Sequence, residues 1–171
     1  MEPIRRFDAS FTELWERVAD RFELSVRRDA AYLNWKFSEP PHVRYPIAAL
    51  KRNGRPEGYA VYRHAQEPRG RVTLLVDFLA DTHDEIGFKT LLRWVDAEAR
   101  QADSDKIRCY ASHLGFRRIM RHSGYFQMRP TLPLAVKLNA VTVPPKFYKH
   151  ADDWHITLGD SDQDLGIRDW D

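Results

Sequence analysis

Asp77 is the residue in this sequence best placed to do chemistry, because it is an acid inside an apolar stretch, residues 71–80, that is rich in β-branched residues. Side chains alternate between the two faces of a strand, so Asp77 shares a face with Leu75 and Leu79. Partial burial raises the pKa of a carboxyl group and suits it to act as a general base. The alternative is a structural acid that is hydrogen-bonded and paired with an arginine.

His113 is the second candidate, since it directly follows another apolar stretch, residues 107–112. Imidazole exchanges protons near neutral pH, so a histidine at a strand end can act as a catalytic acid or base. A loop histidine without a catalytic role is the alternative. Cys109 is the only cysteine, and we expect a small core residue there, because no base or cation is fixed beside it.

A strand–helix–strand unit is predicted to position these residues, with strands over 71–80 and 107–112 and a helix from 82 to about 100. A crossover of this kind leaves its two strands parallel. Where two parallel neighbours begin to diverge, their backbone groups become available to a ligand. The apolar residues of the predicted helix repeat at helical spacing and lie on one face, at Phe88, Leu91, Leu92, Val95 and Ala99.

Two helices and an antiparallel hairpin are predicted before this unit. The first helix follows a capping box that begins at Ser10, and the second, shorter helix begins at Asp29. The hairpin strands cover 45–51 and 58–63, and a tight turn at residues 53–54 joins them. After the unit we expect a short helix over 114–122 closed by Gly124, and then strands over 125–128, 134–138 and 154–158.

Length, charge and cysteine content limit the class of protein. The 171 residues suit a single domain, and residues 152–171 contain seven aspartates and one arginine, so we expect a solvated acidic tail from about residue 160. No apolar run reaches the length of a membrane span and residues 1–6 lack the apolar core of a secretory signal. We therefore predict a cytoplasmic protein that does not bind membranes.

The sequence also gives no sign of a nucleic-acid or metal ligand. The basic residues form no nucleic-acid-binding motif, and the acidic tail lacks the glycine of a calcium loop, so neither nucleic acid nor a metal is expected.

The order of these elements resembles that of the GNAT superfamily of acyl-coenzyme A-dependent N-acetyltransferases, over residues 11–158. Segments 28–37 and 154–162 resemble phrases of a divergent GNAT-like branch, and residues 124–126 are similar to the glycine-aromatic pair of the superfamily. The resemblance implies an α+β fold with a mixed, mostly antiparallel sheet and one central parallel strand pair. Members of the branch often carry two such domains, so a second GNAT-like domain or a homodimer is an expected partner.

The resemblance also implies where acetyl-CoA would bind as co-substrate. Its acyl arm would lie between the two parallel strands, and its pyrophosphate would lie at the start of the helix that follows residue 82, where free N–H groups favour anions. The residues implied to bind the cofactor are Phe78, Leu79, Ala80, His83, Gly87 and Phe88. Asp84 and Glu85 stand in the same loop, and the alternative is a helix start satisfied by its own side chains, with a capping box that begins at Thr82.

Two functions follow from these observations. The first is a GNAT-like N-acyltransferase that moves an acetyl or acyl group from acyl-CoA to a small-molecule amine, with an amino sugar among the acceptors. The resemblance places its base at Asp77, and His113 would replace the usual tyrosine acid, whose position holds Met120. The second is a catalytically degenerate GNAT-like module that binds a ligand or a partner, as the acids at the phosphate loop indicate.

Overall fold

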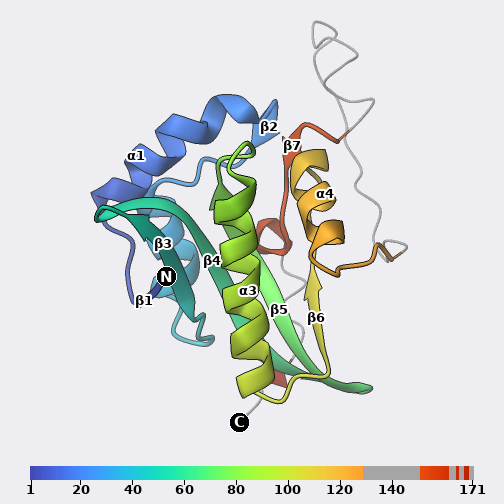
Figure 1. The fold of residues 1–171 in the computed structure, drawn as a ribbon. Coiled ribbons are helices and arrows are strands. Elements are labelled where there is room, and N and C mark those ends of the chain that lie inside the picture. Colours follow the sequence, from blue (N-terminus) through green and yellow to red (C-terminus); the bar gives the residue numbers. More distant parts are fainter. Residues whose placement is uncertain (129–150, 162–164, 166–167, 170–171) are drawn as a thin grey trace, which may run out of the picture.

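The computed structural model of the chain describes residues 1–128, 151–161, 165 and 168–169. Figure 1 shows a twisted sheet with the long helix α3 running across its front. The strands are β1 Glu2–Ile4, β2 Leu24–Ser25, β3 Ile47–Arg52, β4 Arg55–Glu67, β5 Gly70–Ala80, β6 Lys106–Cys109, β7 Trp154–His155 and β8 Arg168–Asp169. The helices are α1 Ala9–Val18, α2 Ala30–Leu33, α3 Glu85–Gln101 and α4 Leu114–His122, with shorter helical turns at Ala19–Arg21, Asn34–Ser38 and Leu158–Asp160.

The main sheet has the strand order β1-β3-β4-β5-β6, and β8 pairs with β4 on a separate branch. All its pairs are antiparallel except β5 with β6, whose register runs from Val72–Lys106 to Leu75–Cys109. Among the described residues β6 is the last strand on that path. The predicted α+β class, with a mixed sheet and one parallel pair joined by a helix, is therefore confirmed.

The hairpin prediction is also confirmed. Asn53 and Gly54 adopt positive φ angles of 53° and 78° at the tight turn between β3 and β4. Strand β4 is longer than predicted, because it pairs with β5 from Gly58–Ala80 to Glu67–Gly70. A register shift after Val61 lets this long ribbon bend across the sheet.

Neighbouring side chains on the central strands face two separate apolar layers. The Phe78 ring contacts Phe88 of α3 and Phe116 of α4, at centroid distances of 5.1 and 5.2 Å. The Tyr59 ring contacts Phe7 and Phe11, which belong to the N-terminal layer. Because side chains alternate along a strand, Asp77 faces away from the α3–α4 layer and toward the N-terminal one.

Both long helices begin differently from the sequence prediction. The N-cap of α1 is Asp8, whose carboxylate accepts from the Ser10 backbone N–H, so the capping box predicted at Ser10 is wrong. The N-cap of α3 is Asp84 rather than Thr82. In both cases an aspartate within two residues of the predicted cap reaches the free N–H groups of the first turn, and aspartate caps as well as serine or threonine do.

The C-terminal predictions hold only in part. Helix α4 and the positive φ of Gly124 are as predicted, but residues 125–128 form no strand and Phe126 is exposed. The predicted strand 134–138 lies outside the described residues. The predicted strand 154–158 is shortened to β7, which pairs in parallel with β2. The solvated tail predicted from about residue 160 lies largely outside the described residues and stays a prediction, although the side chain of Asp160, at its predicted start, is only 9% exposed.

Candidate functional site: the gap between the parallel strands

Strands β5 and β6 part as the resemblance led us to expect. Their pairing ends at Leu75–Cys109, whereas β5 continues to Ala80. The chain after β6 turns away, and Ala111 forms an antiparallel bridge with Thr157 instead. Among the described residues, no strand pairs with residues 76–80 on the side opposite β4. The divergence thus creates a gap between β5 and residues 110–112.

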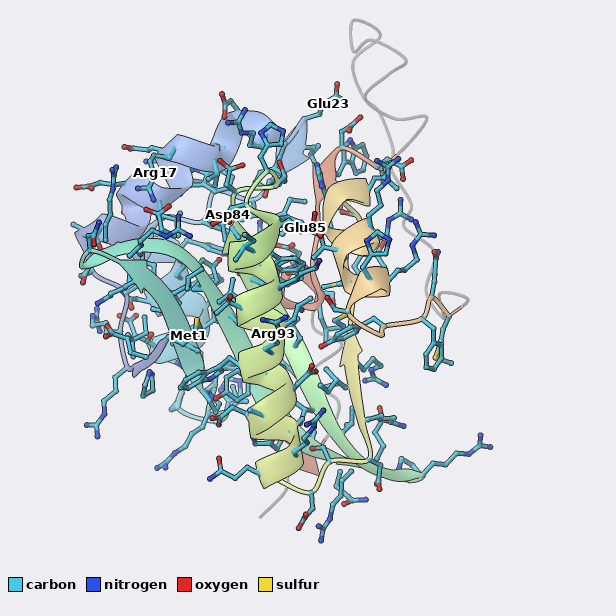
Figure 2. All side chains as sticks on the ribbon, in the orientation of Figure 1. Met1, Arg17, Glu23, Asp84, Glu85 and Arg93 are labelled. Carbon is cyan, nitrogen blue, oxygen red and sulfur yellow. The ribbon has the colours of Figure 1, made fainter. Side chains whose placement is uncertain are left out.

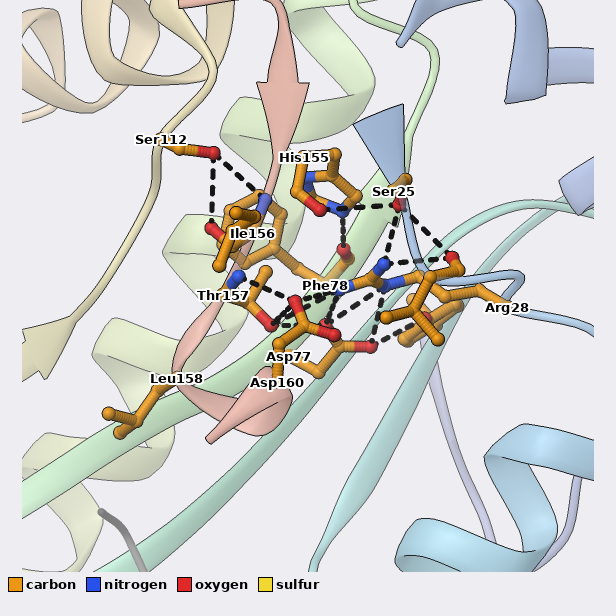
Figure 3. A network of polar contacts seen from close by, with 12 residues as sticks. Ser25, Arg28, Asp77, Phe78, Ser112, His155, Ile156, Thr157, Leu158 and Asp160 are labelled. Atoms are coloured by element: carbon orange, nitrogen blue, oxygen red, sulfur yellow. Dashed lines mark hydrogen bonds and ion pairs between the residues drawn. The ribbon is translucent and has the colours of Figure 1, made fainter. Parts of the chain in front are cut away.

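This gap is occupied by residues 154–160, which we call the inserted segment. Figure 3 shows the segment passing between Ser112 on one side and Ser25 on the other, directly over β5. The Ser112 backbone N–H donates to the Ile156 carbonyl at 3.2 Å, and the Thr157 hydroxyl donates to Asp77 at 2.7 Å. The inserted segment therefore contacts both walls of the gap.

His155 is the fully buried centre of the inserted segment. Its Nε2 lies 2.8 Å from the Phe78 carbonyl oxygen, which can only accept, so Nε2 carries the proton. The imidazole stacks on Phe22 at 4.7 Å and contacts Phe116 at 5.3 Å. Burial holds the pKa of His155 well below its ordinary value, so the side chain is neutral at physiological pH.

Asp77 lies beneath the inserted segment and is 1% exposed. It accepts hydrogen bonds from the Tyr59 hydroxyl at 2.6 Å and from the Thr157 hydroxyl at 2.7 Å, and it pairs with the Arg28 guanidinium at 3.0 Å. Burial raises the pKa of Tyr59 well above its ordinary value, so this phenol stays a donor. The alternative role, a structural acid paired with an arginine, describes this environment. The catalytic role of Asp77 remains a prediction.

Arg28 joins the inserted segment to the sheet. Its Nη2 contacts Asp77 at 3.0 Å and Asp160 at 2.6 Å, and its Nη1 donates to the Ser25 hydroxyl at 2.7 Å. Burial disfavours the charged guanidinium, but Asp77, Tyr59 and Asp160 outweigh that effect and raise the pKa of Arg28. Burial raises the pKa of Asp160 as well, although Arg28 opposes this. One buried cation is thus shared by two carboxylates.

Sequence reasoning did not identify the partners of Asp77. Arg28 and Asp160 stand inside the two phrases that carried the family resemblance, segments 28–37 and 154–162, but the resemblance attached no role to either residue. Arg28 lies 49 positions from Asp77 in the sequence, and Thr157 lies 80 positions from it. The only signal in the sequence was the presence of an arginine in one phrase and of aspartates in the other, and spacing does not pair residues so far apart.

His113 is the N-cap of α4, and its Nδ1 accepts from the Gly115 backbone N–H at 3.2 Å. The ring lies edge-on to Phe22 at 5.4 Å, and burial lowers the pKa of His113. The ring is therefore engaged in capping and packing. Phe22 brings His113 and His155 into one aromatic cluster, a grouping that the sequence analysis did not anticipate.

Asp84 and Glu85 lie at the start of α3, where the pyrophosphate of acetyl-CoA would lie (Figure 2). The Asp84 carboxylate accepts from the Gly87 backbone N–H at 2.9 Å and contacts Arg52 at 3.3 Å. A Cβ at Gly87 would collide with that carboxylate, so this glycine makes room for the cap. Glu85 pairs with Lys89. The self-capped helix, the alternative named above, is what the structure shows.

The remaining residues implied to bind the cofactor occupy different surroundings. Phe78, Leu79 and Phe88 are fully buried and Ala80 is 1% exposed, whereas the His83 side chain is 74% exposed. The Phe78 carbonyl is already bound by His155. Only His83 is thus open to solvent, and cofactor contacts by the other residues would depend on backbone groups.

The described residues show no sign of a metal centre or of a membrane span. Within residues 1–128 and the described C-terminal segments, no three or more histidine, cysteine, aspartate or glutamate side chains gather in a group that could hold a metal ion. No helix in those parts is long and apolar enough to span a bilayer.

No family model matches the sequence, and no curated protein matches it. Several solved structures do have a similar fold. A ribosomal-protein-alanine N-acetyltransferase from Brucella melitensis biovar Abortus 2308 is 13% identical over 74% of this chain and 91% of its own, with a TM-score of 0.55. A probable acetyltransferase is 14% identical over 80% of this chain and all of its own, with a TM-score of 0.56.

An aminoglycoside antibiotic 6'-N-acetyltransferase from Acinetobacter haemolyticus is 12% identical over 81% of this chain and all of its own, with a TM-score of 0.52. At such low identity these matches show the fold alone. They confirm the predicted GNAT-like fold.

Proposed function

We propose that this chain is a catalytically degenerate GNAT-like module that binds a ligand or partner and does not transfer acyl groups. The observation that carries the proposal is the inserted segment. It fills the gap between β5 and residues 110–112, where the acyl arm of acetyl-CoA would lie. His155 and Thr157 already bind the Phe78 carbonyl and the Asp77 carboxylate.

Displacing the inserted segment would be costly. Trp154, His155 and Leu158 are at most 6% exposed, and exposing a large apolar side chain costs about 1.5–3 kcal/mol. Opening would also break the ion pair between Arg28 and Asp160. The binding energy of an acyl-CoA arm would first have to offset these terms, so the closed gap disfavours the cofactor.

The start of α3 supports the same proposal by a separate effect. Asp84 and Glu85 place negative charge where the pyrophosphate would approach. The Asp84 carboxylate also takes the Gly87 N–H that would otherwise face an anion. A diphosphate would therefore meet both repulsion and fewer free donors.

Titration calorimetry of the full chain with acetyl-CoA and with free coenzyme A tests the proposal. We expect a dissociation constant weaker than about 1 mM for both, a binding free energy of only about 4 kcal/mol. Micromolar binding of either compound would overturn the proposal. The double variant Asp84→Ser/Glu85→Gln removes both charges and keeps a capping hydroxyl, so it serves as the matched control. Equally weak binding by this variant would identify the closed gap as the barrier.

The second candidate is a GNAT-like N-acyltransferase that acts on a small-molecule amine such as an amino sugar. The observation that favours it is the edge of β5 at residues 76–80, which no described strand covers on that side. With the inserted segment displaced, an acyl thioester could lie along this edge. The amine would attack the thioester carbonyl, Asp77 would remove its proton through water, and backbone N–H groups would stabilise the oxyanion. Collapse of the oxyanion would break the C–S bond and release the coenzyme A thiolate, which takes up a proton from solvent.

Release of the coenzyme A thiol in the presence of amino sugars, peptide amines and polyamines tests this candidate. Asp77→Asn should abolish transfer while the variant stays folded, and His113→Gln should weaken it. Full activity in Asp77→Asn would remove the base assignment.

For either candidate function, the expected partner is a second GNAT-like domain or a second copy of the chain. Light scattering of the purified protein would detect the second copy as a doubled molar mass.

A further inference from the structure

We propose that the inserted segment is a plug that opens as a unit while the sheet stays folded, with the Arg28–Asp160 ion pair as its latch. The inference rests on the proposed function, because it concerns how the same gap is kept closed. It assigns to Arg28 a positioning role: the guanidinium fixes the segment over β5 and takes no part in any reaction.

Among the described residues, short and isolated contacts hold the backbone of the plug. Its strand β7 pairs with Leu24 and Ser25 of β2, one bridge joins Thr157 to Ala111, and Ser112 binds backbone groups of Trp154 and Ile156. By contrast, β4 and β5 are paired along almost their whole length. Segments held by short, isolated backbone contacts open at lower free energy than long strand ladders. The plug therefore lies at the less stable end of this fold.

Three buried polar atoms of the plug lack a hydrogen-bond partner among the described residues: Trp154 Nε1, His155 Nδ1 and Asp160 Oδ1. A buried polar atom without a partner has lost its contact with water and gained nothing in exchange. All three atoms would regain water when the plug opens. Their presence in one short segment lowers the free-energy difference between the closed and open states.

The charges of the cluster make Asp160 the natural point of release. Arg28 lies 3.0 Å from Asp77 and 2.6 Å from Asp160, so two carboxylates share one guanidinium. Without the Asp160 charge, Arg28 and Asp77 would remain as a neutral pair within the body of the fold. Removing this charge therefore loosens the plug without leaving an unpaired buried charge.

Opening of the plug would release two groups of β5 together. His155 binds the Phe78 carbonyl, and Thr157 binds the Asp77 carboxylate, so both contacts break when the segment leaves. The plug thus covers both the edge of β5 beyond Leu75 and Asp77, the one acid of that strand. The Arg28–Asp160 latch decides whether this edge and this carboxylate are exposed.

Hydrogen exchange of the full chain, measured by mass spectrometry, tests the latch. In Asp160→Asn we expect the amides of residues 154–156 to exchange about tenfold faster or more, while the amides of β4 and β5 keep their protection. Asp153→Asn is the matched control, since it removes the same charge from an exposed position seven residues earlier. That control should leave exchange unchanged. Unchanged exchange in Asp160→Asn, or an equal increase throughout the sheet, would overturn the proposal.

A second variant tests the plug without altering charge. A Cβ at Gly159 would lie 3.0 Å from Phe37 Cζ and 3.3 Å from Asp77 Cβ, so Gly159→Ala crowds the closed segment against β5. The same local increase in exchange is expected. The outcomes separate the two proposals: micromolar acetyl-CoA binding by the unmodified chain refutes the degenerate module, whereas the exchange data alone decide whether the plug exists.

Discussion

The two halves of β5 are held in different ways. From Val72 to Leu75 the strand pairs with β6 through a regular parallel ladder. Beyond Leu75 the strand meets the inserted segment, where the side chains of His155 and Thr157 bind the Phe78 carbonyl and the Asp77 carboxylate. The first half gains its stability from backbone pairing and apolar packing, and the second from a charged cluster and a buried histidine.

This difference shows how a fold can be kept while its ligand site changes. The paired half needs only two apolar strands and the helix that connects them, and many different sequences form such a unit. The filled half depends on particular partners, and Arg28 and Asp160 are 132 positions apart. Substitutions in the two halves should therefore have different consequences for stability and for local opening.

The largest effect is expected for Arg28→Met. The substitution leaves Asp77 and Asp160 buried without their cation, and breaking a buried pair in this way costs about 3–5 kcal/mol. Urea unfolding followed by circular dichroism measures the loss. Arg27→Met is the control, because Arg27 is exposed and pairs only at the surface, so its loss should stay below about 1 kcal/mol. Equal losses in the two variants would mean that the buried cluster does not hold the filled half.

Leu74→Ala tests the paired half. Leu74 is fully buried, and truncating a buried leucine costs about 2–5 kcal/mol through lost burial and the cavity left behind. In contrast to Asp160→Asn, this variant should speed exchange throughout the sheet, because it weakens the shared core. Leu24→Ala, at a leucine that is 45% exposed, is the matched control. Faster exchange confined to residues 154–160 would contradict the division between the two halves.

The pH dependence of stability tests the buried histidines. The folded state lowers the pKa of His155 and of His113, so below about pH 6.5 the unfolded chain binds more protons than the folded one. Stability is therefore complete above that pH and falls as the pH drops through this window, by up to about 1.4 kcal/mol per pH unit for each histidine.

Replacing His155 by glutamine should reduce the slope of stability against pH, because glutamine does not titrate. Its amide N–H can still donate to the Phe78 carbonyl. Urea midpoints measured between about pH 4.5 and about pH 7.5, in steps of roughly half a unit, would show the smaller slope. The exposed His42→Gln is the control. A slope that His155→Gln leaves unchanged would show that His155 is not the buried neutral group described above.

The smallest effect is expected at the start of α3, outside both halves. Asp84→Ala removes an N-cap and should cost about 1 kcal/mol, whereas Asp84→Ser should restore most of that loss. Glu85→Ala breaks the exposed pair with Lys89 and should cost less than Asp84→Ala, because solvent screens an exposed pair. Thermal unfolding of the three variants would check the order. A loss in Asp84→Ala no larger than in Glu85→Ala would argue against Asp84 as the cap.

Local patterns were enough to predict much of the fold. The Asn53-Gly54 turn, the β5–α3–β6 unit and α4 with its terminal Gly124 follow from turn chemistry and helical spacing, and all three are confirmed. Errors arose where neighbouring residues compete for one role, as with Asp84 and Thr82 at the start of α3. Several residues there can cap a helix, and only the backbone path selects one of them.

The sequence by itself determined the class of fold and pointed to Asp77 as an acid in an apolar strand, because periodicity and residue type are local properties. Only the tertiary structure decided what surrounds that acid. Arg28 and Thr157 contact Asp77, and Asp160 contacts Arg28, through chain folding over long separations, and no spacing rule pairs residues so far apart. Whether the gap beside β5 is open or filled depends on those long-range contacts, because burial and ion pairing are properties of the packed chain.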